Sequence, residues 1–155
     1  MRLRALLALV TPFVLLSCSD PTVPSGPPID CNTLAATYLN EDATFTTTPS
    51  GLKYRDVTVG TGTTYATGNI VSVRYAGCTS TGLRFDSNEA PAPTFQFQIG
   101  KAYVIKGWDE GIPGMKVGGR RQLIVPPSLG YGALANGPIP ANSTLAFTVD
   151  AISTP

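Results

Sequence analysis

Residues 104–112 read Val-Ile-Lys-Gly-Trp-Asp-Glu-Gly-Ile, and this stretch decides the fold that we expect. The apolar side chains that lie close to one helical stripe are Val104, Ile105, Trp108 and Ile112. Gly107 and Gly111 lower the intrinsic helix propensity, so packing must hold this helix in place. Pro113 and Gly114 end it. The stretch therefore predicts one short helix with a tryptophan on its buried side.

The segments around this helix have the features of strands. Residues 70–77 alternate well, with Val71, Val73 and Tyr75 on one face. The other predicted strands are residues 52–57, 83–86, 94–99, 118–126 and 145–152. The 16 glycines and 14 prolines favour turns over long helices, and residues 129–143 form a loop rich in them. The pattern indicates an α+β fold, with antiparallel strands and a single short helix.

Composition excludes several classes of function. The chain has 155 residues, of which 43% are hydrophobic, so it can bury a core. A net charge of +1 argues against nucleic-acid binding, which needs clustered Lys and Arg. The absence of histidine excludes Ser-His-Asp and Cys-His nucleophile systems and His-ligated metals. We therefore expect no metal, no cofactor and no nucleic-acid partner.

The first 17 residues have the pattern of a secretory signal peptide. Arg2 and Arg4 form a positive segment, and residues 5–16 are mostly apolar but too few to span a bilayer. The sequence Leu-Leu-Ser before Cys18 resembles a bacterial lipobox, which predicts lipidation of Cys18 and attachment to the membrane. Ser19 favours the outer membrane of the bacterial envelope, on its periplasmic side. The alternative is an ordinary signal peptide in which Cys18 is incidental.

Residues 18–49 are expected to link this anchor to one domain at residues 50–155. The segment 20–30 is a proline-rich tether, residues 31–38 could form a short helix, and residues 40–49 are loop or edge structure. With Cys18 lipidated, Cys31 and Cys78 remain in an oxidising compartment. They form either a disulfide or two separate thiols, and the sequence alone does not decide between these.

Several polar residues have ordinary structural interpretations. Asp86 follows a predicted strand and suits a turn. Asp109 and Glu110 are adjacent on the helix and point apart, which predicts a solvated face and no acid–base pair. Arg120 and Arg121 are interpreted as surface charge on a strand. Tyr131 differs, because it lies between two glycines in a loop and fills no strand face.

Taken together, the motifs and their spacing resemble the FK506-binding-protein (FKBP) type of peptidyl-prolyl cis-trans isomerase. The resemblance covers about residues 52–153. The pieces that carry it are RYAG at 74–77, FDS at 85–87, FQF at 95–97, VIKGWDEG at 104–111, YGA at 131–133, IP at 139–140 and TLAF at 144–147. It implies a twisted antiparallel sheet of about five strands wrapped around one short helix.

The resemblance also implies a site for proline-containing polypeptides. Trp108 would form the floor of a pocket, and Asp86 would lie at its rim. The walls would be Tyr75, Phe85, Phe97, Val104, Ile105 and Phe147, with Phe95 nearby. Tyr131 would offer its hydroxyl to a substrate carbonyl, and Ile105 its backbone N–H. Such an enzyme needs neither a nucleophile nor a metal, and its clients would be exported proteins that fold slowly at proline.

The chain departs from the family pattern in a few places. Pro91 stands where the family often has an arginine that pairs with the rim aspartate, the loop 134–139 is one residue shorter, and Asn136 stands where some members have a histidine. These departures favour an alternative, a module that binds proline segments with little turnover. A further alternative is an interaction lipoprotein that keeps the fold only as a scaffold. Residues 31–49 are too short for an added helical dimerisation domain, which predicts a monomer.

Overall fold

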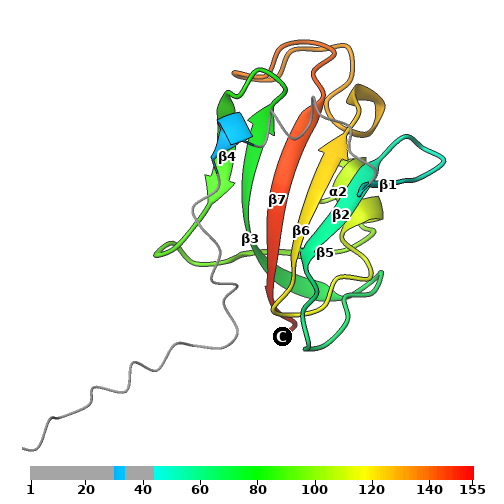
Figure 1. Ribbon diagram of the computed structural model, residues 1–155, viewed down its shortest axis with the longest axis vertical. Coiled ribbons are helices and arrows are strands. Elements are labelled where there is room, and N and C mark those ends of the chain that lie inside the picture. The colour runs from blue at the N-terminus through cyan, green and yellow to red at the C-terminus, as the bar shows by residue number, and fades with distance from the viewer. Residues whose placement is uncertain (1–29, 34–43) are drawn as a thin grey trace, which may run out of the picture.

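A seven-stranded antiparallel sheet with one short helix against it forms the domain (Figure 1). The computed structural model describes residues 30–33 and 44–155. The sheet order is β1-β2-β6-β7-β3-β4, and β5 pairs with β3. The strands are β1 (Thr46–Thr47), β2 (Lys53–Thr58), β3 (Ile70–Thr79), β4 (Arg84–Asn88), β5 (Phe95–Gln98), β6 (Arg120–Val125) and β7 (Leu145–Ser153). Each of the six predicted strands is present, which confirms the α+β prediction.

The number of strands differs from the expected five for a geometric reason. β3 has ten residues, and two short strands share one of its edges. β5 pairs with residues 70–73 of β3, and β4 pairs with residues 75–78. β4 and β5 therefore occupy one position in the sheet, next to β3, and the two-residue β1 adds an outer strand beside β2. Without these two features the sheet has the five positions that the family resemblance implies.

The helix α2 (Lys106–Gly111) begins later and ends earlier than predicted. Ile105 is its N-cap, with an extended backbone at φ −60° and ψ 152°, and Ile112 is its C-cap. α2 lies against one face of the sheet, behind β6 and β2 in the view of Figure 1. Its buried residues are Gly107, Trp108 and Gly111. The predicted tryptophan therefore does face the core.

Two glycines let α2 approach the sheet closely. A Cβ atom at Gly107 would lie 2.6 Å from Cγ1 of Val125, and one at Gly111 would lie 2.8 Å from Cδ2 of Leu123. Val125 and Leu123 are both fully buried on β6. Because real Cβ atoms do not approach so closely, only glycine fits at these two positions. The segment has a low helix propensity because the close contact with β6 requires glycine at both positions.

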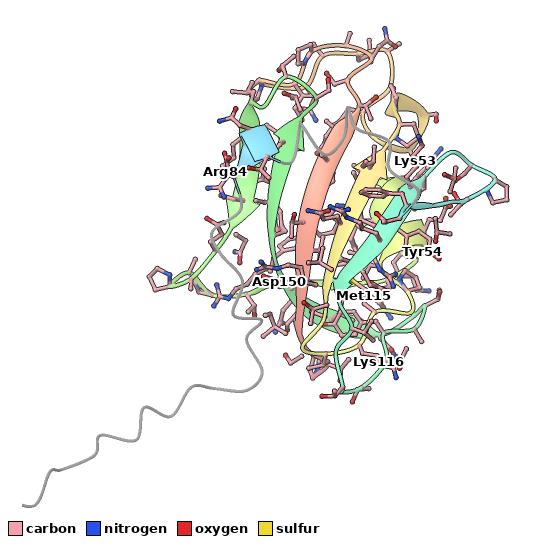
Figure 2. All side chains as sticks on the ribbon, viewed as in Figure 1. Lys53, Tyr54, Arg84, Met115, Lys116 and Asp150 are labelled. Carbon is pink, nitrogen blue, oxygen red and sulfur yellow. A yellow bond between two sulfur atoms is a disulfide. The ribbon has the colours of Figure 1, made fainter. Side chains whose placement is uncertain are left out.

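The two arginines of β6 are not surface charges, so that prediction was wrong. Arg121 is 6% exposed and forms a bidentate ion pair with Asp56, with donor–acceptor distances of 2.7 and 2.9 Å. Its Nη1 also donates to the carbonyl oxygens of Gly111 and Pro113 at the end of α2. Arg120 pairs with Asp150, which projects from β7 (Figure 2). Arg121 is buried and Arg120 mostly buried because each has a carboxylate on a neighbouring strand.

A disulfide ties the N-terminal extension to the sheet. Cys31 and Cys78 are bonded, with their Cα atoms 5.7 Å apart and a sequence separation of 47 residues. Residues 31–33 are helical, and the rest of the predicted segment 31–38 lies outside the described residues. The predicted signal peptide, Cys18 and the proline-rich tether lie outside them as well. Over residues 30–33 and 44–155, we find no helix with the length and apolar character needed to cross a membrane.

We expect Gly107→Ala to lower the free energy of unfolding by about 1–3 kcal/mol, since overpacking a buried contact costs that much. The added methyl group would overlap Val125, which cannot move into solvent, and this outweighs the propensity gain of about 1 kcal/mol from alanine. Urea unfolding measures the difference. Lys106→Ala, on the exposed side of the same helix, is the control and should change stability by less than about 0.5 kcal/mol. Equal stability of Gly107→Ala and the native protein would contradict the close seating of α2.

We expect Cys31→Ser to lower the free energy of unfolding by about 2–4 kcal/mol, because the disulfide closes a long loop. Cys31 is the better choice for substitution, since Cys78 is fully buried and a serine there would bury a hydroxyl. Urea unfolding with and without dithiothreitol is the measurement. The reductant should bring the native protein down to the variant and leave the variant unchanged. Native protein that is insensitive to reductant, although its thiols become titratable, would count against this contribution.

Candidate active site

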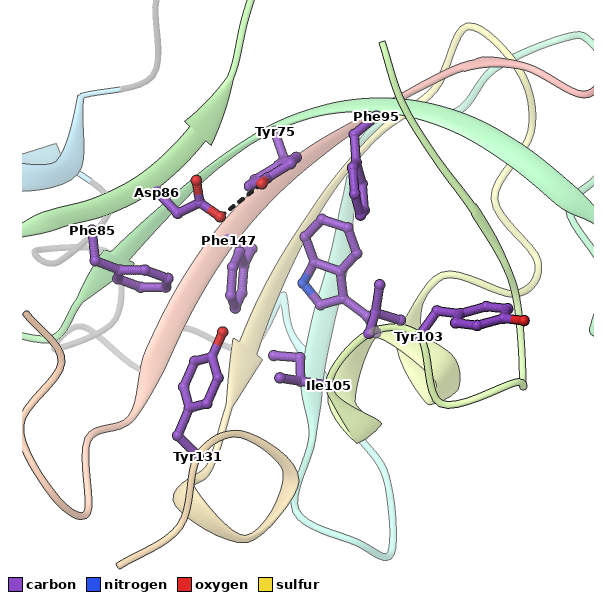
Figure 3. A pocket seen from close by; sticks show the side chains of 10 residues that line it. Tyr75, Phe85, Asp86, Phe95, Tyr103, Ile105, Tyr131 and Phe147 are labelled. Carbon is purple, nitrogen blue, oxygen red and sulfur yellow. Dashed lines mark hydrogen bonds between the residues drawn. The ribbon is translucent and has the colours of Figure 1, made fainter. Parts of the chain in front are cut away.

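A pocket of about 160 Å³ opens where α2, β3, β4 and the loop after the 3₁₀ turn η1 (Pro127–Leu129) meet (Figure 3). This volume is below the range of about 300–1,000 Å³ that drug-sized ligands occupy. It therefore suits one ring-sized side chain better than a nucleotide or a flavin. The lining residues are Tyr75, Phe85, Asp86, Phe95, Tyr103, Val104, Ile105, Trp108, Tyr131 and Phe147.

The structure brings together every residue that the sequence analysis placed in the pocket except Phe97. Phe97 is 5% exposed and lies behind the lining, with its ring centroid 5.7 Å from those of Phe95 and Trp108. It supports the pocket from the core and does not line it. Phe95 and Phe97 are two residues apart on β5 and share a face, so what separates them is depth, and Phe97 is the more buried of the two.

The sequence analysis missed Tyr103, which lies in the loop between β5 and α2 and is 73% exposed. Its ring points away from the cavity in Figure 3, so the residue belongs to the outer rim. One feature of the sequence could have indicated Tyr103 as a pocket residue. It directly precedes Val104 and Ile105, in the stretch that leads into the helix.

Trp108 is the centre of the aromatic cluster. Its ring centroid lies 5.0 Å from that of Tyr75 and 5.3 Å from that of Phe147, with interplanar angles of 88° and 82°. Phe95 also meets it edge to face, at 6.3 Å and 74°. Such edge-to-face contacts bring positive ring edges against negative ring faces and fix the orientation of the rings. The indole Nε1 is buried without a hydrogen-bond partner among the described residues, so the floor of the pocket is largely unsolvated.

A glycine and a β-bulge shape the sheet side of the pocket. The pairing steps from Gly77–Asp86 to Cys78–Arg84, which leaves Phe85 as the extra residue of a bulge in β4. Because a bulge re-aims the side chains next to it, both Phe85 and Asp86 can line the same pocket. A Cβ atom at Gly77 would lie 2.7 Å from Cε1 of Phe147 and 2.8 Å from Cζ of Phe85. The absent side chain is what lets these two rings pack edge to face at 5.6 Å.

Asp86 and Tyr75 form a hydrogen-bonded pair at the rim. The hydroxyl of Tyr75 donates to Oδ2 of Asp86 over 2.7 Å, drawn as a dashed line in Figure 3. Burial raises the pKa of Tyr75 well above its usual range, and the hydrogen bond and negative charge of Asp86 raise it further. The carboxylate of Asp86 has no ion-pair partner within residues 30–33 and 44–155, in keeping with Pro91 at the position of the family arginine. The hydrogen bond from Tyr75 holds it in place instead.

Tyr131 adds a hydroxyl at the mouth of the cavity, whose lining is mostly aromatic. It follows η1, and its hydroxyl points inward between Phe147 and Ile105 in Figure 3. Partial burial, followed by the negative charge of Asp86, raises the pKa of Tyr131 above its ordinary value. The phenol therefore stays protonated at neutral pH and can donate a hydrogen bond.

The backbone N–H of Ile105 is a second available donor. It lines the same pocket and donates to no acceptor in the described part of the chain. No group of three or more metal-ligating side chains occurs in residues 30–33 and 44–155. The arrangement can therefore bind a small apolar ring, exclude water from it and offer hydrogen bonds to a carbonyl beside it.

Comparison with known proteins gives the family. Residues 62–152, more than half of the chain, match the family model of the FKBP-type peptidyl-prolyl cis-trans isomerase. The chain belongs to this family. The match includes the aromatic side chains, Asp86 and Tyr131, so the pocket lies inside the FKBP domain.

Solved FKBP structures share the fold. The crystal structure of AtFKBP13 is 36% identical in sequence, with a TM-score of 0.67 over 72% of this chain and 98% of that chain. FkpA from Escherichia coli is 31% identical, with a TM-score of 0.68 over 81% of this chain and 59% of that chain.

Curated relatives include FK506-binding protein 4 of Chaetomium thermophilum, which is 48% identical over 99 residues. The alignment takes in 64% of this chain, which spans only a fifth of that relative's length. These curated FKBP relatives are eukaryotic proteins, and they give no support to a bacterial lipoprotein form.

Proposed function

We propose that the protein is an active peptidyl-prolyl cis-trans isomerase that acts on proline-containing polypeptides. The observation that carries this proposal is a small cavity walled by aromatic rings, with two hydrogen-bond donors at its mouth, the hydroxyl of Tyr131 and the backbone N–H of Ile105. A proline ring fits a cavity of about 160 Å³, whereas the polypeptide on either side of it must remain outside. The family to which the chain belongs supports the same conclusion.

The chemistry follows from the polarity of the amide bond. Rotation about an X–Pro bond breaks amide resonance, and the barrier is about 18–20 kcal/mol. The planar amide carries more charge separation than the twisted transition state. A cavity with few polar groups and little water therefore stabilises the twisted form relative to the planar form. Trp108 and the rings around it supply that environment without any covalent step.

The polar groups at the mouth have separate roles in this proposal. The protonated hydroxyl of Tyr131 and the backbone N–H of Ile105 hold carbonyl oxygens of the bound segment, which fixes the proline over Trp108. Asp86 lies at the rim near the rotating amide, oriented by the hydroxyl of Tyr75. No residue here needs to change its protonation state during the reaction.

A second candidate function is a module that binds proline segments and turns them over slowly. The observation that favours it is the carboxylate of Asp86, which forms no ion pair among the described residues and lacks the arginine that family members often have. A carboxylate held by one tyrosine hydroxyl is more exposed and less constrained than one in a bidentate pair. The intact aromatic set favours the enzyme.

The decisive experiment is a prolyl-isomerisation assay on the protein from Ser19 onward, with a Leu-Pro peptide and a refolding protein limited by proline. We expect acceleration that falls about threefold to tenfold in Tyr131→Phe and in Asp86→Ala. A fall of this size corresponds to the loss of one hydrogen bond, about 0.5–1.5 kcal/mol. The matched control is Tyr103→Phe, which removes a hydroxyl that points away from the cavity and should keep full activity.

A folded protein without any acceleration would exclude the enzyme. Titration of proline peptides against Trp108 fluorescence, the signal of the only tryptophan in the chain, would then distinguish the binding module from a scaffold. Activity that is unchanged in both variants would keep the enzyme but exclude the roles given to Tyr131 and Asp86.

We further propose that the protein is exported and anchored by a lipid on Cys18, as a monomer that assists the folding of exported proteins. The support is the signal-like segment 1–17 with its lipobox-like end, together with the Cys31–Cys78 disulfide, since disulfides persist in oxidising compartments. One acyl chain binds a membrane weakly, so a stable anchor requires the multiple chains of a bacterial lipoprotein. The curated eukaryotic relatives give no support to the lipid anchor or to export.

Expression of the whole chain in a double-membrane bacterium tests the anchor. We expect the native chain in the membrane fraction, with a mass that corresponds to cleavage before Cys18 plus acyl chains. Cys18→Ser should remove the lipid and release the protein, whereas the control Cys31→Ser should keep it. An unprocessed chain in the cytosol with both cysteines reduced would contradict the export proposal.

A further inference from the structure

Asp109 does not face solvent as a free charge, although the sequence predicted a solvated face. It lies in the first turn of α2, next to Trp108, and both of its oxygens accept hydrogen bonds. The backbone N–H of Gly100 donates to Oδ1 over 2.7 Å, and that of Ala102 donates to Oδ2 over 3.0 Å. The helix thus holds the connection that leads into it from β5.

This connection has few other constraints. In the described part of the chain, no other hydrogen bond is formed by a backbone N–H of residues 100–105. Gly100 and Ala102 both have left-handed backbones, with φ of 77° and 56°. For alanine this conformation costs free energy, so something must hold it. The carboxylate of Asp109 is the group that does so.

The same connection forms one side of the proline pocket. Tyr103, Val104 and Ile105 line the pocket, and the N–H of Ile105 is one of the two donors at its mouth. Ala102, which Asp109 binds, lies three residues before Ile105. A change in the backbone at Ala102 would therefore shift both the apolar wall and the donor.

We propose that Asp109 is a positioning residue for the proline site, which it sets by fixing the connection 100–105. This inference rests on the proposed function, because it concerns the same pocket. Asp109 touches no substrate in it. The carboxylate acts through Gly100 and Ala102 on the position of Ile105, while the neighbouring Trp108 provides the floor.

The chain offers a matched control on the next residue. Glu110 is also a carboxylate on α2, but its oxygens accept hydrogen bonds from the hydroxyl of Ser50, 2.7 and 2.9 Å away. Ser50 does not line the pocket. Glu110→Gln thus removes a charge and weakens a helix-to-loop contact without affecting the connection 100–105.

The test compares Asp109→Asn with Glu110→Gln in the isomerisation assay and in titrations of a Leu-Pro peptide by Trp108 fluorescence. An asparagine presents one oxygen and one N–H group, so one of the two backbone donors loses its acceptor. We expect kcat/KM in Asp109→Asn to fall about tenfold, the equivalent of roughly 1.4 kcal/mol, with a rise in KM. Glu110→Gln should stay within about twofold of the native protein, the equivalent of roughly 0.4 kcal/mol.

A folded Asp109→Asn protein with native kcat/KM and native peptide affinity would overturn the proposal. If the native protein binds the peptide without turnover, the proposed enzyme fails, and a tenfold loss of affinity in Asp109→Asn still supports the positioning role. If the native protein does neither, the positioning role fails with it. Equal losses in both variants would also overturn it, because they would show a general effect of charge on the helix.

A second measurement needs no variant and remains decisive if Asp109→Asn does not fold. Hydrogen exchange of the native protein should protect the amides of Gly100 and Ala102, whereas those of Lys101 and Tyr103 should exchange freely. Uniformly fast exchange across residues 100–103 would show that the carboxylate does not hold the connection, and would overturn the proposal.

Discussion

The close contact between α2 and β6 is the constraint on which the pocket depends. Gly107 and Gly111 present no side chains to the sheet, so the helix backbone packs directly onto Val125 and Leu123. The close approach of the helix to β6 fixes how deeply Trp108, the residue after Gly107, lies in the aromatic cluster. A helix held further out would leave the tryptophan without its contacts to Tyr75 and Phe147 and would open the floor to water.

On the sheet side too, a glycine leaves room for aromatic rings to pack. Gly77 leaves the space in which Phe85 and Phe147 meet, and the bulge beside it turns two successive side chains of β4 toward one cavity. Helix and sheet therefore each use missing Cβ atoms to bring aromatic rings together. The polar groups, Asp86 and the hydroxyl of Tyr131, come from the edges of this arrangement, where water can still reach them.

Much of the fold and of the pocket could be predicted from the sequence, because strand alternation and the stretch 104–112 are local signals. What could not be predicted depends on partners distant in the chain. Arg121 looks like a surface residue until β2 brings Asp56 beside it. Tyr65 lies in a polar loop and is nevertheless buried, since its hydroxyl donates to the carbonyls of Ser72 and Ser153. The structure differs from the predictions that Phe97 forms a pocket wall and that Asp109 lies on a solvated face. Sequence periodicity indicates the face of a strand or helix on which a side chain lies, but not the groups that the side chain contacts there.

The disulfide gives the chain a covalent topology that differs from its sequence order. The bond between Cys31 and Cys78 closes a ring that contains β1, β2 and nearly all of β3. A mechanical pull on the chain before Cys31 passes through the two sulfur atoms to the end of β3, and the ring carries no tension. β3 is hydrogen-bonded to β7 on one side and to β4 and β5 on the other. The force therefore enters at an inner strand, one position from the edge formed by β4 and β5, and the outer strands β1 and β2 at the opposite edge are not peeled away first.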